Sequence, residues 1–292
     1  MQPVRPGRQG RAHHRRARGH RTVSTAIDNR LDRRFTALKA AGRTGLVPFI
    51  TAGDPAPELT VPVMHALVAA GADVIELGMP FSDPMADGPV IQHASERALR
   101  HGVSVAQVLE WVRAFRRDDA ETPVVLMGYL NPVEIMGVER FAASAADAGV
   151  DGVLLVDCPI EEDATAAPLR EAGLRRILLT APTTAEARLQ RACELAEGFL
   201  YYVSFAGITG AARLSVDAIA ERVADIRKRS RAPVAVGFGV RDADSARAIA
   251  AFADAVVIGS ALVESLAGSE DAGQVEQRVR TFLEPIRTAL DR

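Results

Sequence analysis

Two acidic residues, Glu76 and Asp87, bracket a stretch that is rich in proline and glycine. It reads ELGMPFSDPMADGP over residues 76–89 and begins at the end of a predicted strand. A carboxyl group in a dry pocket has a raised pKa, so it can exchange a proton near neutral pH. The pattern therefore predicts general acid–base chemistry. Two structural alternatives remain: Glu76 could pair with an arginine, and Asp87 could cap an Asp-Gly turn.

Other chemistries find fewer candidate residues. A Schiff-base mechanism needs a lysine at a strand end, but the two lysines, Lys39 and Lys228, fall in predicted helices. A metal site needs clustered ligands, and the histidines of the body lie on predicted helices or at their ends, so we predict no metal. Carboxylates remain at the predicted strand ends. They are Asp54, Glu76, Asp83, Asp87 and Asp157.

The elements that must position these acids are short apolar runs separated by helical patterns. Near-continuous apolar runs are typical of parallel strands that are buried on both faces. The runs lie at 46–50, 73–77, 123–127, 152–156, 176–180, 200–204, 234–238 and 255–258. Eight strands, each followed by a helix, predict an α/β fold of the (βα)₈ TIM barrel type. A doubly wound open sheet is the alternative, but no G-x-G-x-x-G follows the first strand.

Helical spacing adds detail to this barrel. An extra N-terminal helix is predicted from residue 27 to 38, and a last helix from 275 to 290. Three repeats, AGADVIEL, AGVDGVLL and AGLRRILL, each place a glycine where a helix should end before a strand begins. Ser104 and Ser215 are predicted helix caps.

A barrel places its active groups on the loops after the strands, so Glu76 should lie at the barrel mouth. Glycine clusters follow the last three strands, at 206–210, 236–240 and 258–261. Such loops let backbone N–H groups approach a phosphate. We therefore predict a phosphorylated substrate and a short phosphate-binding helix before the last helix, with Ser260 as its cap.

The first 22 residues differ from the rest of the chain. They contain seven arginines and no acid, whereas the whole chain has a net charge of −2. We expect residues 1–26 to form a disordered extension and residues 27–292 to form one barrel domain. A nucleic-acid or membrane tether and a transit peptide are alternatives to a dispensable segment. The acidic body predicts no nucleic-acid partner, no apolar run predicts a membrane span, and the two cysteines favour a cytoplasmic location.

Seven motifs in order along the chain resemble those of the tryptophan synthase α subunit family. The resemblance spans roughly residues 27–290, and ELGMPFSDPMADGP is its most specific part. The other motifs are PFITAGDP (48–55), GYLNP (128–132), DCPIEE (157–162), YYVSFAGITG (201–210), GFGV (237–240) and IGSA (258–261).

The resemblance implies a lyase of tryptophan biosynthesis that cleaves indole-3-glycerol phosphate to indole and glyceraldehyde 3-phosphate. It implies that Glu76 is the acid/base and that Asp87 is the anion beside the indole N–H. Substrate-binding positions are also implied by the match. They are Phe49, Tyr201, Thr209, Gly210, Gly239, Gly259 and Ser260.

The resemblance also implies a partner, a β subunit that carries pyridoxal phosphate in an αββα heterotetramer, while this chain needs no cofactor. Asp83 and Asn131 match residues that face that partner. One rival is an indole-glycerol-phosphate synthase or an isomerase, whose strand-end lysine or Cys/Asp pair is not seen. The other is a barrel retained mainly as a non-catalytic activator of the β subunit.

Overall fold

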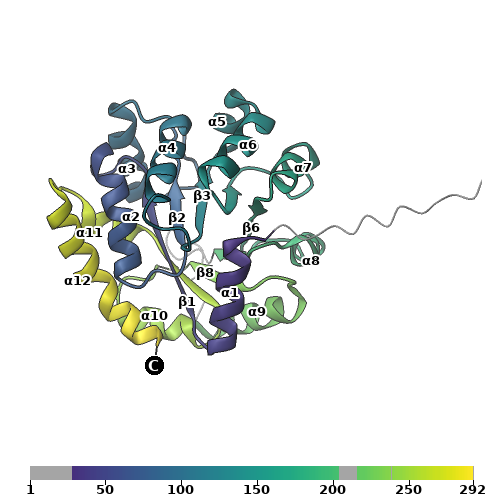
Figure 1. Cartoon of the computed structure of the whole chain (residues 1–292). Coiled ribbons are helices and arrows are strands. Elements are labelled where there is room, and N and C mark those ends of the chain that lie inside the picture. Colours follow the sequence, from purple (N-terminus) through teal and green to yellow (C-terminus); the bar gives the residue numbers. More distant parts are fainter. Residues whose placement is uncertain (1–27, 204–215, 238, 292) are drawn as a thin grey trace, which may run out of the picture.

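The computed structural model describes residues 28–203, 216–237 and 239–291, and these residues form one barrel of parallel strands surrounded by helices (Figure 1). The strands are β1 (Gly45–Thr51), β2 (Ile75–Gly78), β3 (Val124–Gly128), β4 (Gly152–Leu155), β5 (Arg175–Arg176), β6 (Leu178–Thr180), β7 (Leu200–Val203), β8 (Val234–Gly237) and β9 (Ala255–Ile258). The first helices are α1 (Arg30–Ala41), α2 (Thr60–Ala69) after the 3₁₀ turn η1 (Pro57–Leu59), α3 (Pro89–Arg100), α4 (Val105–Phe115), α5 (Leu130–Met136) and α6 (Val138–Ala148). The remaining helices are α7 (Asp163–Glu171), α8 (Glu186–Leu195), α9 (Val216–Arg229), α10 (Ala243–Ala250), α11 (Ser260–Leu266) and α12 (Ala272–Leu290).

The segment 175–180 joins the two ends of the sheet. Its first part, β5, pairs with β4, and its second part, β6, pairs with β7. The other neighbours are also parallel, and β9 pairs with β1. The predicted barrel is confirmed, with one correction: the single strand expected at 176–180 is divided at Ile177, so eight predicted strands appear as nine.

Alternation along the strands creates two apolar cores. Side chains such as Leu46 and Ile50 pack outward against the helices, whereas Val47 and Val257 pack inside the barrel. Successive side chains of a strand point to opposite faces. Val74, just before β2, packs in the interior core, so Glu76, two residues later, points to the interior as well. Burial on both faces explains why these strands are apolar throughout.

Helix α1 closes the amino end of the barrel. Asn29 caps it by accepting a hydrogen bond from the Leu31 N–H, which satisfies one of the free donors of its first turn. Its apolar side chains join the interior core, and the Phe35 and Phe199 ring centroids lie 5.7 Å apart. The predicted extra helix is confirmed and leaves the carboxyl end of the barrel as the open mouth.

The helix ends follow the sequence signals. Gly71, Gly149 and Gly173 of the three repeats have φ values of 92°, 89° and 81°, a left-handed conformation that glycine adopts without steric cost. The Ser104 side chain accepts from the Gln107 N–H, as predicted, while Ser215 lies outside the described residues. The last helix, α12, packs against α2 and α10 and so brings the end of the chain beside its early part (Figure 1).

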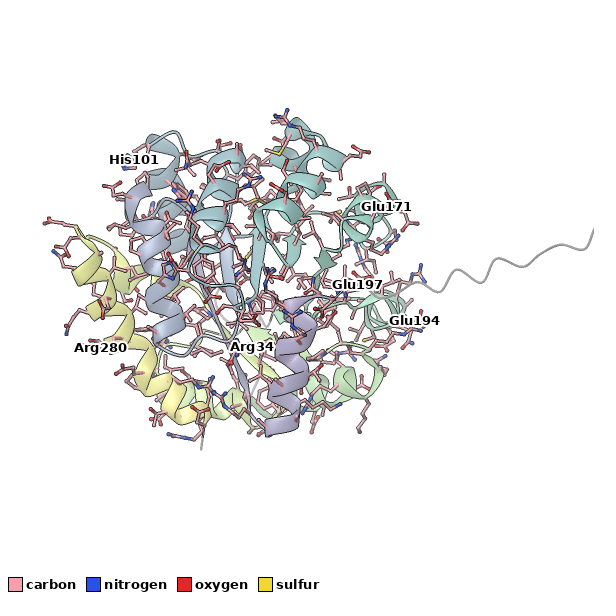
Figure 2. All side chains as sticks on the ribbon, viewed as in Figure 1. Arg34, His101, Glu171, Glu194, Glu197 and Arg280 are labelled. Atoms are coloured by element: carbon pink, nitrogen blue, oxygen red, sulfur yellow. The ribbon has the colours of Figure 1, made fainter. Side chains whose placement is uncertain are left out.

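The outer surfaces of the helices carry charged side chains. His101, Glu171, Glu194 and Arg280 lie at the periphery of the helical ring (Figure 2). Within the described ranges, none of the helices combines the length and the apolarity that crossing a bilayer requires.

Candidate active site

Glu76 lies on β2 with its side chain inside the barrel. Its backbone registers with Phe49 on β1 and with Val125 on β3, and the residue is 1% exposed. Burial and, to a smaller extent, the nearby charge of Asp87 together raise the pKa of Glu76 to about 8. The predicted rise in pKa is confirmed, because removing a carboxylate from water favours its protonated form. Near neutral pH this group can therefore donate a proton.

Asp87 approaches the same space from the loop between β2 and α3. The loop turns on itself through hydrogen bonds from the Met85 N–H to the Asp83 carbonyl and from the Asp87 N–H to the Pro84 carbonyl. The Asp87 side chain is half-buried, and burial raises its pKa to about 6, while a hydrogen bond from Tyr129 lowers it. Asp87 is therefore mainly an anion at pH 7, whereas Glu76 is mainly neutral.

Two aromatic side chains line the interior beside these acids. Phe49 is buried and packs with Ala94 and Val263, and it fits only because Gly78 leaves room: a Cβ at Gly78 would lie 2.6 Å from the Phe49 ring. A Cβ at Gly237 would likewise overlap the Tyr201 hydroxyl. Burial raises the pKa of Tyr201 well above its usual value, with further contributions from Glu76 and Asp87. The phenol therefore stays protonated within the electrostatic reach of both acids.

The barrel mouth contains polar atoms that lack a partner. Among the described residues, three buried side-chain atoms make no hydrogen bond, and two of them are Glu76 Oε1 and Thr51 Oγ1. Thr51 ends β1 and lines the same small cavity as Asp87. A buried unpaired polar atom is costly, so this pair indicates a place where a polar ligand completes the hydrogen bonding.

The other strand-end acids are engaged elsewhere. Asp54 is buried and paired with Arg97 at 2.6 Å and 3.1 Å. Asp73, at the opposite end of β2, accepts from Arg287 at 2.9 Å. Asp157 is exposed and accepts from the Leu130 N–H at the start of α5. Asp83 lies exposed on the loop. Of the five acids at the predicted strand ends, the structure thus brings together Glu76 and Asp87.

The predicted phosphate end is described in part. Gly239, with φ of 48°, is exposed after β8, and Gly259 and Ser260 lie at the start of α11, where the first N–H groups of a helix have no partner within the helix. The expected cap is wrong: Gly259 occupies the N-cap position and Ser260 is the first helical residue, without a side-chain cap bond. Thr209 and Gly210 lie outside the described residues.

One residue that the sequence reasoning missed is Tyr129, which follows β3 directly. It is 3% exposed, its hydroxyl accepts from the Ala86 N–H at 3.0 Å, and hydrogen bonding from Tyr129 lowers the pKa of Asp87. Its position at the carboxyl end of a strand, inside the GYLNP motif, was a usable signal. Asn131 of the same motif is exposed on α5.

The described residues contain no group of three or more His, Cys, Asp or Glu side chains that could hold a metal ion. The two lysines lie exposed on α1 and α9. The arrangement at the mouth therefore combines a protonated acid, an anion and aromatic walls. It can deliver a proton to a bound ligand and stabilise a positive charge that develops close by.

Comparison with known proteins gives the same family by sequence and by structure. The family model described as tryptophan synthase alpha chain matches residues 35–291. The tryptophan synthase alpha chain of Thioalkalivibrio sulfidiphilus is 60% identical over 265 residues, which are 90% of this chain and 100% of that one. That of Laribacter hongkongensis is also 60% identical over 265 residues, with 90% and 99% covered.

Solved structures are similar over the same length. Tryptophan synthase subunit alpha from Legionella pneumophila superposes with a TM-score of 0.84 at 45% identity, covering 90% of this chain and 99% of that one. A chain of Mycobacterium tuberculosis tryptophan synthase superposes with a TM-score of 0.81 at 38% identity, with 90% and 99% covered. The similarity spans both β2, with Glu76, and the loop that carries Asp87.

Proposed function

The chain belongs to the tryptophan synthase alpha chain family, and from that membership we propose that Glu76 and Asp87 perform its cleavage reaction. Members of this family are carbon–carbon lyases of tryptophan biosynthesis that split indole-3-glycerol phosphate into indole and glyceraldehyde 3-phosphate. The observation that carries the proposal is the pairing of a buried acid, whose pKa is about 8, with a half-buried acid, whose pKa is about 6.

The reaction needs one proton delivered and one proton removed. Protonated Glu76 gives its proton to C3 of the indole ring, which places positive charge on the ring nitrogen. Asp87 stabilises that charge through the ring N–H. The bond from C3 to the glycerol carbon then breaks, and its electron pair restores the aromatic ring. The hydroxyl on the released carbon returns a proton to Glu76 as the aldehyde forms, so the acid is regenerated.

Other residues at the barrel mouth are assigned to contacts with the indole ring and with the phosphate of the substrate. Phe49 and Tyr201 supply apolar and aromatic walls for the indole ring. Gly239, Gly259 and Ser260, together with Thr209 and Gly210, supply the loops for the phosphate. The first N–H groups of α11 support this assignment, since the start of a helix attracts an anion. The two acids supply the proton transfers of the reaction, so this chain carries it out without a cofactor. Its similarity to alpha chains of a biosynthetic enzyme supports a cytoplasmic location.

The direct test is release of indole from indole-3-glycerol phosphate by the purified chain, alone and with a β subunit of the family. We expect cleavage in both cases and faster cleavage in the complex. A chain that released no indole alone but accelerated its partner would be the non-catalytic activator. The intact pair of acids argues against that alternative.

The face for the β subunit lies at the barrel mouth, where Asp83 and Asn131 are exposed. Of the large hydrophobic side chains in the described ranges, three are exposed, and two of these belong to this face: Met85 is 86% exposed and Ile135 is 80% exposed. Exposed apolar groups within a polar rim are typical of a protein interface. We propose that this face docks on a β subunit that holds pyridoxal phosphate, in an αββα assembly.

Ile135→Asp should weaken binding of the β subunit by at least about 10-fold, because a charge would be buried against the partner. Indole release by the isolated chain should not change, since Ile135 lies on the outer surface of α5. Val216→Asp, at the third exposed hydrophobic residue, is the matched control and should bind normally. Titration of each variant with β subunit in a calorimeter measures the affinity; equal affinities would remove this face as the interface.

We propose that residues 27–292 form the catalytic domain and that residues 1–26 are an extension without a role in it. The family model begins at residue 35, and the Thioalkalivibrio sulfidiphilus protein is matched along 100% of its length by 90% of this chain. Both findings support a barrel that needs no such extension.

Deleting residues 1–22 should leave the free energy of unfolding unchanged within about 0.5 kcal/mol and leave turnover unchanged. The deletion removes all seven arginines of the segment. Urea unfolding and indole release, compared with the full chain, measure both quantities. A marked loss of either would show that the extension contributes to the barrel.

A further inference from the structure

Tyr129 connects the end of β3 to the loop that carries Asp87, and it does so with a single hydroxyl group. That oxygen accepts a hydrogen bond from the Ala86 N–H at 3.0 Å. An N–H group can only donate, so the proton of the phenol remains available for the carboxylate of the next residue. Tyr129 and Asp87 line the same small cavity, and hydrogen bonding from Tyr129 lowers the pKa of Asp87.

The tyrosine itself is held from two directions. Its backbone follows β3 at the N-cap position of α5, and the Asp157 carboxylate accepts from the next N–H, that of Leu130, at 2.8 Å. The ring packs against Phe81 with centroids 5.3 Å apart. These contacts give the Tyr129 hydroxyl a fixed position at the barrel mouth, beside the loop between β2 and α3.

We propose that Tyr129 is a positioning residue that fixes the loop at Ala86 and so directs the Asp87 carboxylate for the cleavage reaction. The inference rests on the proposed function of Asp87. The Tyr129 hydroxyl fixes the loop backbone at Ala86, one residue before Asp87. Tyr129 acts on the substrate only through Asp87, because it orients the Asp87 carboxylate before the substrate binds.

The consequence is specific to the transition state. Positive charge reaches the indole nitrogen only after C3 is protonated, so a displaced Asp87 weakens binding of the transition state more than binding of the substrate. Loss of the hydrogen bond that fixes Ala86 leaves its N–H without a partner and displaces Asp87, which lowers the rate by roughly 10-fold to 100-fold. Because hydrogen bonding from Tyr129 lowers the pKa of Asp87, removing the hydroxyl should raise that pKa.

The test is Tyr129→Phe, which removes the oxygen and keeps the ring packed against Phe81. Relative to the unaltered protein, kcat should fall by roughly 10-fold to 100-fold with little change in KM. The acidic limb of the kcat/KM profile should move to higher pH by on the order of one unit. Tyr202→Phe is the control, because it removes the hydroxyl of another buried tyrosine on the outer face of β7. It should leave kcat and the acidic limb of the kcat/KM profile unchanged.

A double-mutant cycle separates positioning from a general effect on folding. In the Asp87→Asn background, Tyr129→Phe should cost much less than it does alone, because two residues that act through one another are not additive. Full additivity, or a higher KM with an unmoved acidic limb, would overturn the inference. If the unaltered protein itself released no indole, the proposed function would fail first, so the two failures are distinguishable.

Discussion

Glu76→Gln is expected to abolish nearly all indole release, with a loss of about 10²–10⁴-fold in kcat. Glutamine has nearly the same shape as a protonated glutamate but cannot transfer a proton, so the ring carbon receives none and the glycerol hydroxyl loses none. Substrate binding should remain close to normal. Steady-state kinetics with indole-3-glycerol phosphate measures the change, and a variant that kept a large share of the activity would remove Glu76 from this role.

The same substitution should stabilise the fold at alkaline pH. A loss of activity in Glu76→Gln could then not be attributed to unfolding of the variant. The pKa of Glu76 is raised from 4.5 to about 8 by burial and by Asp87. A group whose pKa is raised on folding contributes stability at low pH and loses it as pH rises from 4.5 toward 8. Glu76→Gln removes that loss, so its free energy of unfolding should exceed that of the unaltered protein by on the order of a few kcal/mol at pH 8. Urea titrations at pH 5 and pH 8 measure the difference.

The unaltered protein should show a bell-shaped dependence of kcat/KM on pH. Activity rises as Asp87 ionises near pH 6 and falls as Glu76 loses its proton near pH 8. The two groups interact, so the two limbs belong to the pair. In Glu76→Gln the alkaline limb should disappear from any residual activity.

Asp87→Asn is expected to lower kcat by about 10²–10³-fold while leaving affinity for the phosphate nearly intact. The amide keeps the size of the side chain but removes the charge opposite the indole nitrogen. Since the charge of Asp87 contributes to the raised pKa of Glu76, the alkaline limb of the pH profile should also move to lower pH. Kinetics across pH 5–9, together with binding of inorganic phosphate, measures these effects.

Asp54→Asn provides a control for that experiment. Asp54 is also a buried acid beyond a strand, but it pairs with Arg97, so its loss should affect stability more than the chemical step. Unchanged turnover in Asp87→Asn would refute the role of Asp87. A similar loss of kcat in both variants would show that the loop architecture, and not the charge beside the indole ring, limits the rate.

Several features could be predicted from the sequence because they depend on local rules. The αL glycines at Gly71 and Gly149 end their helices as the repeats indicated. The raised pKa of Glu76 follows from an acid within an apolar strand. The division of the strand at Ile177 could not be predicted, because β5 and β6 satisfy different neighbours across the barrel. The cap of α11 was assigned to Ser260 by residue type, yet backbone geometry gives it to Gly259.

By itself, the sequence determined the barrel, the strand that carries Glu76 and the stiff loop that carries Asp87, because periodicity, proline and glycine act over a few residues. Only the tertiary structure decided which acids share one space. The motif resemblance singled out Glu76 and Asp87, and contacts between distant segments separate the five carboxylates at the predicted strand ends: Arg97 pairs with Asp54, while Tyr129 fixes the loop of Asp87 at Ala86. Such pairing depends on which strands are neighbours in the barrel, so no local pattern encodes it.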